Sequence, residues 1–282
     1  MSIAVITDTD ASLPDQIAEE RGIIQVPITV HFGEEILKSN EDIKDAELVA
    51  RIEREGKLPT TSAPAPGDFA SAFQQAFQHG ADEVICLTVS GEVSATYQAA
   101  LAARDFMPER EITVVDTWSV SMGQGFMALR AAEMAAQGAG REEILQAVMD
   151  VRDRTYLFAS LATLKFMAMS GRVGAISAEM AKMLNIKPIL TIQNGKLDLL
   201  EKIRTRRKAW QRLVDLAGEG LSGREVEEIF VLHVAAEEEA QEFTLLLQSQ
   251  LDMPEEIPLA ELSPGLSVHT GPGLVGVALT AV

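Results

Sequence analysis

The chain has 282 residues, of which 47% are hydrophobic and only 5% aromatic, and its formal net charge is −18 at pH 7. This length predicts two domains of ordinary size or one large one, and the acidity argues against nucleic acids and anionic membrane surfaces as partners. The single cysteine, Cys86, excludes a disulfide within the chain.

Targeting and metal-binding signals are missing from the sequence. There is no run of eighteen apolar residues, and the N-terminal MSIAVITD lacks the basic and long apolar regions of a secretory signal. We therefore expect a cytoplasmic protein without an integral membrane segment. The histidines are dispersed singly and no Cys/His spacing suits zinc, so we expect neither a metal nor another cofactor.

Strands and helices alternate in the first half of the chain. Short β-branched or apolar runs predict strands, and apolar residues at helical spacing predict helices. The predicted order is a strand at 3–7, a helix near Leu13-Pro14 capped by Ser12, an extended stretch at 23–32, helices at 45–55 and 68–79, a strand at 84–89, a helix at 94–106, a strand at 112–115 and a helix at 122–136. Continuous apolar strands between amphipathic helices are typical of a parallel sheet covered on both faces.

The pattern changes after a predicted helix at 142–154. An apolar run at 158–164 and a predicted helix at 176–184 precede the β-prone stretch 187–193 and Asn194-Gly195, the strongest short hairpin signal. A helix at 205–219, a strand at 228–234, an acidic helix and a terminal strand follow. We predict an α/β fold of two domains, with a parallel sheet covered by helices in 1–156 and a mixed sheet with helices in 157–282.

The segment VHTGPGLVG, residues 268–276, combines a His-Thr pair with a glycine-rich turn. Glycine lets the backbone approach a ligand closely, and proline stiffens the chain. We therefore predict a loop at the mouth of a buried strand, where His269, Thr270 and backbone amides surround a small anion. A tight turn with an incidental histidine is the alternative.

Hydroxyl and carboxyl side chains follow several of the predicted strands. Because the carboxyl ends of parallel strands share one edge of a sheet, such side chains can converge on a ligand there. For each residue taken alone, capping of the next helix is the alternative. The segments concerned are Thr7-Asp8-Thr9, Ser90-Gly91 and Asp116-Thr117 with Ser119 and Ser121, together with Thr61-Ser62 in a proline-rich loop.

The chain resembles the DegV-type fatty-acid-binding proteins over essentially its whole length. The resemblance rests on eight segments in the same order: VITDTDASLP (5–14), TSAPAPGDF (61–69), SGEVSATYQAA (90–100), VVDTWSVSMGQG (114–125), SGRVGA (170–175), LNIKPIL (184–190), KIRTRRKA (202–209) and VHTGPGLVG (268–276). It implies a two-domain α/β fold that buries a long acyl chain in an apolar tunnel between sheet and helices.

The resemblance also implies the residues that hold the ligand. The carboxylate contacts would be Thr61, Ser62, Ser90, His269 and Thr270, with Arg172 nearby and with Ser121 and Gly91 as further ligand or partner contacts. The family usually has a second serine where Gly91 stands and a glycine where Ala95 stands, so one hydroxyl fewer is expected at the carboxylate.

A separate ATP-dependent kinase is the partner that the resemblance implies, with the chain as the lipid-presenting subunit of a fatty acid kinase. That kinase would phosphorylate the bound carboxylate to an acyl phosphate. The chain has no G-x-x-x-x-G-K-[ST] segment of its own, and we expect it not to be an enzyme. The basic run that includes Arg204, Arg206 and Arg207 is either a docking surface for the kinase or a solvated helix start.

The sequence leaves two enzymatic alternatives open. Residues 123–128 fit G-x-G-x-x-A, the pattern of a nucleotide-dependent oxidoreductase, although the glycines lie about seven residues beyond the strand and close helix packing explains them equally well. A serine-type hydrolase of a lipid ester would combine Ser90 or Ser94 with His269 and an aspartate, Asp8 or Asp116. No G-x-S-x-G segment surrounds either serine.

Overall fold

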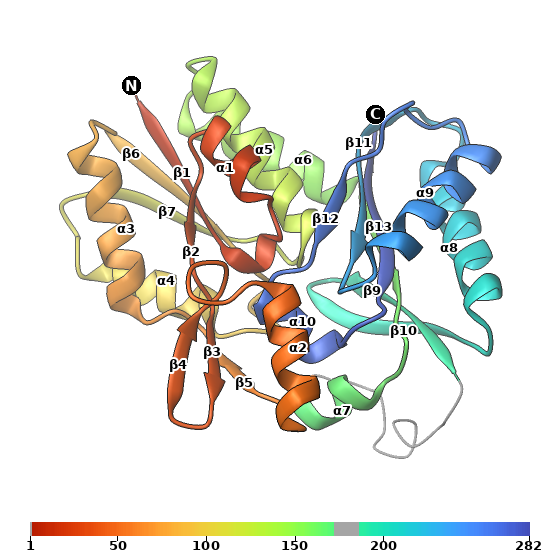
Figure 1. Ribbon diagram of the computed structural model, residues 1–282. Helices are drawn as coiled ribbons and strands as arrows, with labels where there is room; N and C mark the ends of the chain where they lie inside the picture. The colour runs from red at the N-terminus through yellow and green to blue at the C-terminus, as the bar shows by residue number, and fades with distance from the viewer. Residues whose placement is uncertain (1, 172–185) are drawn as a thin grey trace.

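Four parallel strands form the first sheet, in the order β2-β1-β6-β7 (Figure 1). The computed structural model describes residues 2–171 and 186–282. All six residues of β6 are buried, because elements cover both faces of the sheet, as the apolar run of this strand predicts. The strands are β1 (Ile3–Asp8), β2 (Ile24–Val26), β6 (Glu83–Thr88) and β7 (Glu111–Asp116).

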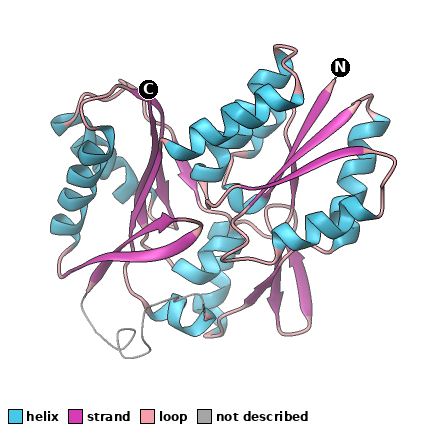
Figure 2. Cartoon of the chain, turned by 180° about the vertical axis from the view of Figure 1, so that it is seen from behind, coloured by secondary structure: helices cyan, strands magenta, loops and turns pink. Residues whose placement is uncertain are grey.

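Helices pack on the two faces of this sheet. On one face, Phe69 and Phe73 of α3 pack with Ala100 of α4 against the strands. On the other face, α5 packs against β1 and β6, and α6 packs against α5; Figure 2 shows these layers from behind. The helices are α1 (Asp15–Glu20), α3 (Pro66–Gln78), α4 (Thr96–Asp105), α5 (Met122–Ala136) and α6 (Arg141–Asp153), with a 3-10 turn η1 (Thr9–Ala11).

The predicted extended stretch at 23–32 is divided between two sheets. Pro27 lacks a backbone N–H and cannot continue the ladder of β2, and the N–H of Ile28 donates to Thr9 Oγ1 at 3.0 Å. The chain then enters a small antiparallel sheet in the order β4-β3-β5, against which α2 (Asp45–Glu55) packs. Its strands are β3 (Thr29–Phe32), β4 (Glu35–Lys38) and β5 (Thr60–Ser62).

Ser12 does not cap the helix that follows it, contrary to the sequence prediction. It ends the turn η1 with a φ of 50°, and its Oγ accepts a hydrogen bond from the N–H of Ser263 at 3.2 Å. The helix α1 begins at Asp15, after Pro14, without a side-chain cap. The Ser12 hydroxyl therefore links two distant segments and does not start a helix.

Six strands form the second sheet, in the order β10-β9-β8-β13-β11-β12. The pair β11 and β12 is parallel and the other neighbours are antiparallel, so the sheet is mixed, as predicted. Asn194 and Gly195, with φ of 50° and 79°, form the predicted hairpin turn. The strands are β8 (Thr155–Ser160), β9 (Lys187–Gln193), β10 (Lys196–Ile203), β11 (Val226–His233), β12 (Leu259–Glu261) and β13 (Val275–Ala281).

The second sheet lies between its own helices and the first unit. On one face, the rings of Trp210 in α8 and Phe243 in α9 have centroids 6.0 Å apart. On the other face, Phe126 of α5 lies 6.0 Å from Phe230 of β11, so one apolar core joins the two units. The helices of this half are α7 (Lys165–Ser170), α8 (Arg206–Leu221), α9 (Glu237–Gln250) and α10 (Pro264–Thr270).

The two-domain α/β fold, with a parallel sheet followed by a mixed one, confirms the predicted fold class. The first strand of the second sheet, β8, begins at Thr155, and the domain boundary at residue 156 stays a prediction. The predicted helix at 176–184 lies outside the described residues. Within the described ranges, no helix has the length and apolar character that crossing a bilayer requires.

Candidate functional site

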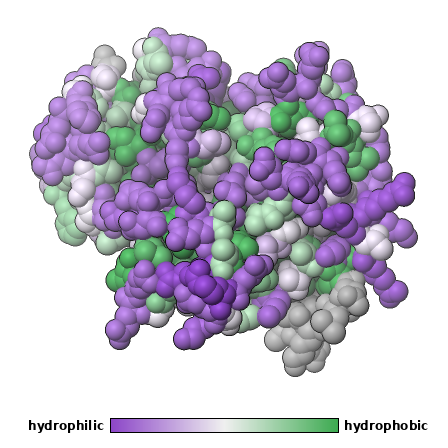
Figure 3. Space-filling model, in the orientation of Figure 1, coloured by the Kyte–Doolittle hydropathy of each residue, from purple (hydrophilic) through white to green (hydrophobic). Residues whose placement is uncertain are grey.

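An apolar cavity lies between the two units. Its volume is about 290 Å³, close to the lower end of the range for small-molecule sites. Ile28 and Val89 line it from the first unit, and Leu157, Leu190 and Leu232 line it from strands of the second. The outer face in Figure 3 is, by contrast, largely hydrophilic. A wall made mostly of aliphatic side chains suits an aliphatic ligand.

A cluster of hydroxyls and one imidazole interrupts the apolar wall. Thr61 Oγ1 and His269 Nε2 are 2.8 Å apart, within hydrogen-bonding distance, although the two residues are 208 positions apart in the chain. Ser62 and Thr270 also line the cavity, and Ser62 Oγ lies 2.8 Å from His31 Nε2. We call Thr61, Ser62, His269 and Thr270 the Thr61–His269 cluster. Four of the predicted ligand contacts thus come together on β5 and α10.

The chemistry of the Thr61–His269 cluster suits a small anionic group. A threonine or serine hydroxyl donates one hydrogen bond, and a neutral imidazole donates from one of its two nitrogens. A carboxylate that enters an apolar cavity needs such donors, because burying an unpaired anion is costly. Polar donors at one place on an otherwise apolar wall therefore favour an amphiphile with an anionic end.

The short helix α10 carries His269 and Thr270 to the cavity. It begins after Ser263, whose Oγ accepts from the Leu266 N–H at 3.3 Å, and it has Pro264 in its first turn. The sequence interpretation of residues 268–270 as loop is therefore wrong: they form the last turn of a seven-residue helix, which is too short to show a clear apolar period. The loop begins at Gly271 and leads into the buried strand β13.

Gly271 ends α10 in a conformation that requires glycine. Its φ is 75°, and its N–H donates to the Ser267 carbonyl at 2.8 Å. A Cβ at this position would lie 2.2 Å from the ring of Phe166 in α7. Since α7, α10 and β5 lie together at the same end of the molecule (Figure 1), this glycine positions the final turn that carries His269.

Asp10 and Ser121 add two further polar side chains to the cavity wall. Ser121 precedes α5 with a φ of 51°, and its N–H donates to the Asp10 carbonyl at 2.7 Å. Asp10 Oδ1 accepts from Ser263 Oγ at 2.8 Å, and burial raises the pKa of the Asp10 carboxyl. The sequence pointed to Ser121 but not to Asp10, which lies two residues beyond the buried strand β1, in the turn η1.

Ser90 and Gly91 do not line the cavity. Ser90 Oγ donates to the Gly195 carbonyl at 2.7 Å, and the Gly91 N–H donates to Asp116 Oδ1 at 3.1 Å. These contacts connect the end of β6 to the β9–β10 hairpin and to the end of β7, and the assignment of both residues as ligand contacts stays a prediction. Ser94, four residues beyond Ser90, does line the cavity, with its Oγ 2.7 Å from Thr96 Oγ1. Its place in the same Ser-rich segment was the available signal.

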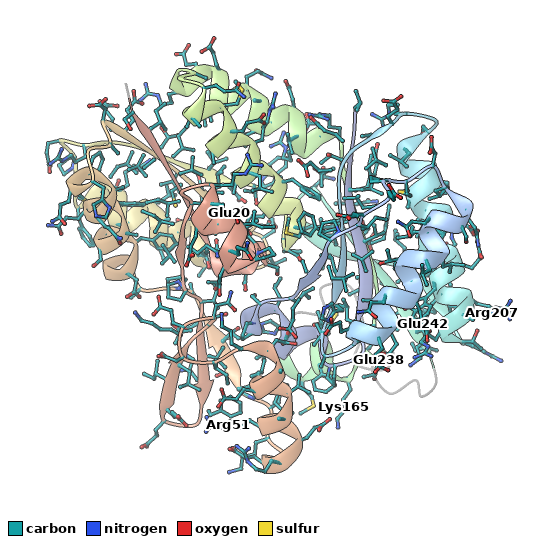
Figure 4. The ribbon with its side chains drawn as sticks, turned by 45° about the horizontal axis from the view of Figure 1, so that its top comes forward. Glu20, Arg51, Lys165, Arg207, Glu238 and Glu242 are labelled. Atoms are coloured by element: carbon teal, nitrogen blue, oxygen red, sulfur yellow. The ribbon has the colours of Figure 1, made fainter. Side chains whose placement is uncertain are left out.

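The predicted basic contacts lie away from this cluster or outside the described residues. Arg172 falls in the range that the structure does not describe. Arg204, Arg206 and Arg207 are exposed at the start of α8, and Figure 4 shows Arg207 projecting outward from the molecule. Arg206 Nη1 lies 3.0 Å from Glu239 Oε1, and its guanidinium lies 5.0 Å from the centre of the Trp210 ring. These three exposed arginines form a basic surface away from the cavity, and this surface is a candidate docking region.

The two enzymatic alternatives gain no support from these contacts. The hydroxyls of Ser90 and Ser94 bond to Gly195 and Thr96, as described above, while His269 Nε2 bonds to Thr61. A Cβ at Gly123 would lie 2.3 Å from Ser119 Oγ, so packing at the start of α5 accounts for this glycine. Within the described residues, neither Ser90 nor Ser94 pairs with His269, and residues 123–128 do not form a strand-end phosphate loop.

Comparison with known proteins identifies the family. Residues 2–282 match the family model described as "Uncharacterised protein, DegV family". DegV domain-containing proteins of Streptomyces coelicolor and Deinococcus radiodurans are 33% and 34% identical to this chain, and each match covers 99% of this chain and 98% of the relative.

Solved structures agree with this result. A Thermus thermophilus DegV family protein, described for its fatty acid binding, superposes with a TM-score of 0.91 at 33% identity and 100% coverage of both chains. DegV of Bacillus subtilis, described as a fatty acid binding protein, has a TM-score of 0.88 at 27% identity, again over 100% of both chains. The chain belongs to the DegV family.

Proposed function

We propose that this chain binds a long-chain fatty acid, with the acyl tail in the apolar cavity and the carboxylate at the Thr61–His269 cluster. The observation that carries the proposal is the placement of Thr61 and His269, 2.8 Å apart, on the wall of an otherwise mainly apolar cavity. The fatty acid binding described for the Thermus thermophilus relative, at 33% identity over the full chain, supports it.

The energetics favour tight binding. Burial of one methylene contributes about 0.8 kcal/mol, so about fifteen methylenes contribute on the order of 12 kcal/mol before the cost of association is subtracted. The hydroxyls of Thr61 and Ser62 and the imidazole of His269 offset the desolvation of the carboxylate, and Thr270 adds a donor once it releases its bond of 3.3 Å to the Leu266 carbonyl. Hydroxyl donors hold a carboxylate less strongly than a bidentate arginine does, which leaves one of its oxygens reactive.

The chain acts, in this proposal, as the lipid-presenting subunit of a fatty acid kinase and supplies no catalytic groups. A carboxylate oxygen attacks the γ-phosphorus of ATP on a separate kinase, the bond to the β-phosphate oxygen breaks, and acyl phosphate and ADP are released. Because the kinase needs ATP, the pair works in the cytoplasm. The exposed run with Arg204, Arg206 and Arg207 is the proposed docking surface, since its positive charge contrasts with the acidic chain.

Blocking the cavity tests the binding step. Leu197 is half-buried on β10 and lines the cavity, so Leu197→Trp should lower the affinity for added fatty acid by at least about tenfold. Leu199 is also half-buried on β10 but is not among the lining residues, and Leu199→Trp is the matched control. Titration of both variants with a fluorescent fatty acid measures the effect. Equal affinity of the two variants would contradict the assignment of the cavity.

Charge reversal tests the presentation step. Arg204→Glu with Arg207→Glu should slow acyl phosphate formation by an added fatty acid kinase subunit while fatty acid binding stays unchanged. Arg206 is left intact because it pairs with Glu239 and packs on Trp210. Arg21→Glu with Lys57→Glu, at two exposed positions of the first unit, changes the net charge by the same amount on another surface. Acyl phosphate formed from ATP by this chain alone would contradict the division into two subunits.

A further inference from the structure

Asp10 and Ser121 form a second polar position in the cavity, which the Thr61–His269 cluster does not include. Asp10 is 6% exposed and Ser121 is 2% exposed, and both line the cavity. The Ser121 N–H donates to the Asp10 carbonyl at 2.7 Å, which holds the two residues beside each other. We call them the Asp10–Ser121 pair.

The polar atoms of this pair have few partners within the protein. Ser121 Oγ is buried, and no residue in the described ranges forms a hydrogen bond with it. The side-chain donor to the Asp10 carboxylate in those ranges is Ser263 Oγ, which bonds to Oδ1 at 2.8 Å. Buried hydroxyls are normally hydrogen-bonded, because an unmade bond leaves the cost of desolvation uncompensated. An unsatisfied hydroxyl on a cavity wall therefore points to a polar group on the ligand.

The Asp10–Ser121 pair lies at the opposite end of α10 from His269. Asp10 Oδ1 bonds to Ser263 and is so close to Gly265 that a Cβ there would lie 2.3 Å away, which places it at the start of the helix. His269 is in the last turn. Six residues of helix rise roughly 9 Å, so a ligand with its carboxylate at the Thr61–His269 cluster reaches the pair partway along its chain.

The charge of Asp10 selects the kind of group that fits beside it. Burial raises the pKa of its carboxyl, and Asp8 is close enough to interact electrostatically with it. A ligand carboxylate at this point would add a further buried negative charge to these two acids, which is unfavourable. A neutral group with both a donor and an acceptor meets no such penalty, and it can bond to a carboxylate oxygen and to a serine hydroxyl at once.

On the basis of the proposed function, we propose that the preferred ligand is a long-chain fatty acid that carries a hydroxyl group along its chain, held by the Asp10–Ser121 pair. The ligand hydroxyl donates its hydrogen to the Asp10 carboxyl and accepts a hydrogen bond from Ser121 Oγ. Both protein groups then gain a partner. An unsubstituted chain at the same place leaves the Ser121 hydroxyl and one oxygen of Asp10 against methylene groups.

Competition binding with stearic acid and a set of hydroxystearic acids that differ only in the position of the hydroxyl tests this proposal on the full chain. At least one positional isomer should bind about tenfold more tightly than stearic acid, because each 1.4 kcal/mol of binding free energy corresponds to about a factor of ten. Ser121→Ala should abolish this preference, in part by raising the affinity for stearic acid, because it removes the hydroxyl that an unsubstituted chain leaves without a partner. Asp10→Asn should reduce the preference while keeping an oxygen for Ser263.

A matched control separates this pair from other hydroxyls in the cavity. Thr191 also lines the cavity, but its Oγ1 already donates to the Leu157 carbonyl at 2.8 Å, so Thr191→Val should leave the preference intact. Thermal unfolding without ligand shows whether each variant is folded, and Ser121→Ala alone decides the question if Asp10→Asn is unfolded.

The outcomes distinguish this inference from the proposed function. Equal affinity for stearic acid and all of its hydroxylated isomers, or a preference that persists in Ser121→Ala, would overturn the inference and leave fatty acid binding intact. Asp10 would then serve solely to tie α10 to the first unit through Ser263. Failure of every acid to bind, with or without a hydroxyl, would contradict the proposed function itself.

Discussion

Thr61 and His269 lie on β5 and α10 and meet at 2.8 Å on the cavity wall. If both hold the carboxylate, Thr61→Val and His269→Ala should each weaken fatty acid binding by about tenfold, the usual effect of losing a hydrogen bond to a charged group. The double variant should lose less than the sum, because the two side chains bond to each other. Calorimetric titration measures these effects, with Thr244→Val on α9 as the control. Unchanged affinity in both single variants would remove the site assignment.

Asp45 begins α2 in a buried position, and burial raises the pKa of its carboxyl from 3.8 to about 7. Because the folded state holds this proton more tightly than the unfolded state, its contribution to the free energy of unfolding is fully present below about pH 4 and falls as the pH rises to about 7. One pKa unit corresponds to about 1.4 kcal/mol, so the loss is on the order of 4 kcal/mol.

Substitution of Asp45 tests this pH dependence. Asp45→Asn removes the titrating group, so the variant should show a smaller decrease in stability between pH 4 and pH 7 than the wild type. Urea denaturation at a series of pH values gives the slopes. Asp150→Asn, at an exposed position on α6, should keep the wild-type slope. A wild-type slope in Asp45→Asn would mean that this carboxyl is ionised in the folded protein.

Among the elements, α10 depends on the residue that ends it. Gly271→Ala should destabilise the protein by about 2–4 kcal/mol, since a φ of 75° costs an L-residue about 1 kcal/mol or more and the contact with Phe166 adds an overpacking cost. Gly138→Ala, at a φ of 81° with nothing within 4 Å of its Cβ, measures the cost of a positive φ without a steric contact. Chemical denaturation compares the two. Equal losses would show that the contact of the added methyl group with Phe166 costs nothing.

Elements were predictable from the sequence where they have enough residues to show an apolar period or a characteristic turn. The helix Asp45–Glu55 has the predicted bounds, because three turns show the apolar period clearly, and the Asn194-Gly195 turn has the backbone angles that its residues favour. The seven residues of α10 were too few for a period, and the last three, 268–270, were interpreted as loop. Ser12 has the residue type of a helix cap, but its partner, the Ser263 N–H, lies at the far end of the chain.

At the scale of the whole molecule, the cavity exists only where segments from both units meet. The sequence pointed to Thr61, Ser62, His269 and Thr270 through the family resemblance, and the structure brings these four side chains to one wall. It could not show that the Ser90 hydroxyl bonds to Gly195, which is 105 positions away. It also could not show that Asp10 faces the cavity, because this depends on how α10 packs against η1. Contacts between distant segments therefore set the hydrogen-bond partners of Ser12, Ser90 and Asp10, which the sequence could not show.

The central claim is that this chain carries a fatty acid between its two units, and mass spectrometry of the purified protein tests it most directly. We expect the native protein to contain one fatty acid per chain, released on denaturation and solvent extraction, and Leu197→Trp to contain far less. A chain that is empty when purified and takes up no added fatty acid, with or without a hydroxyl group, would contradict the claim.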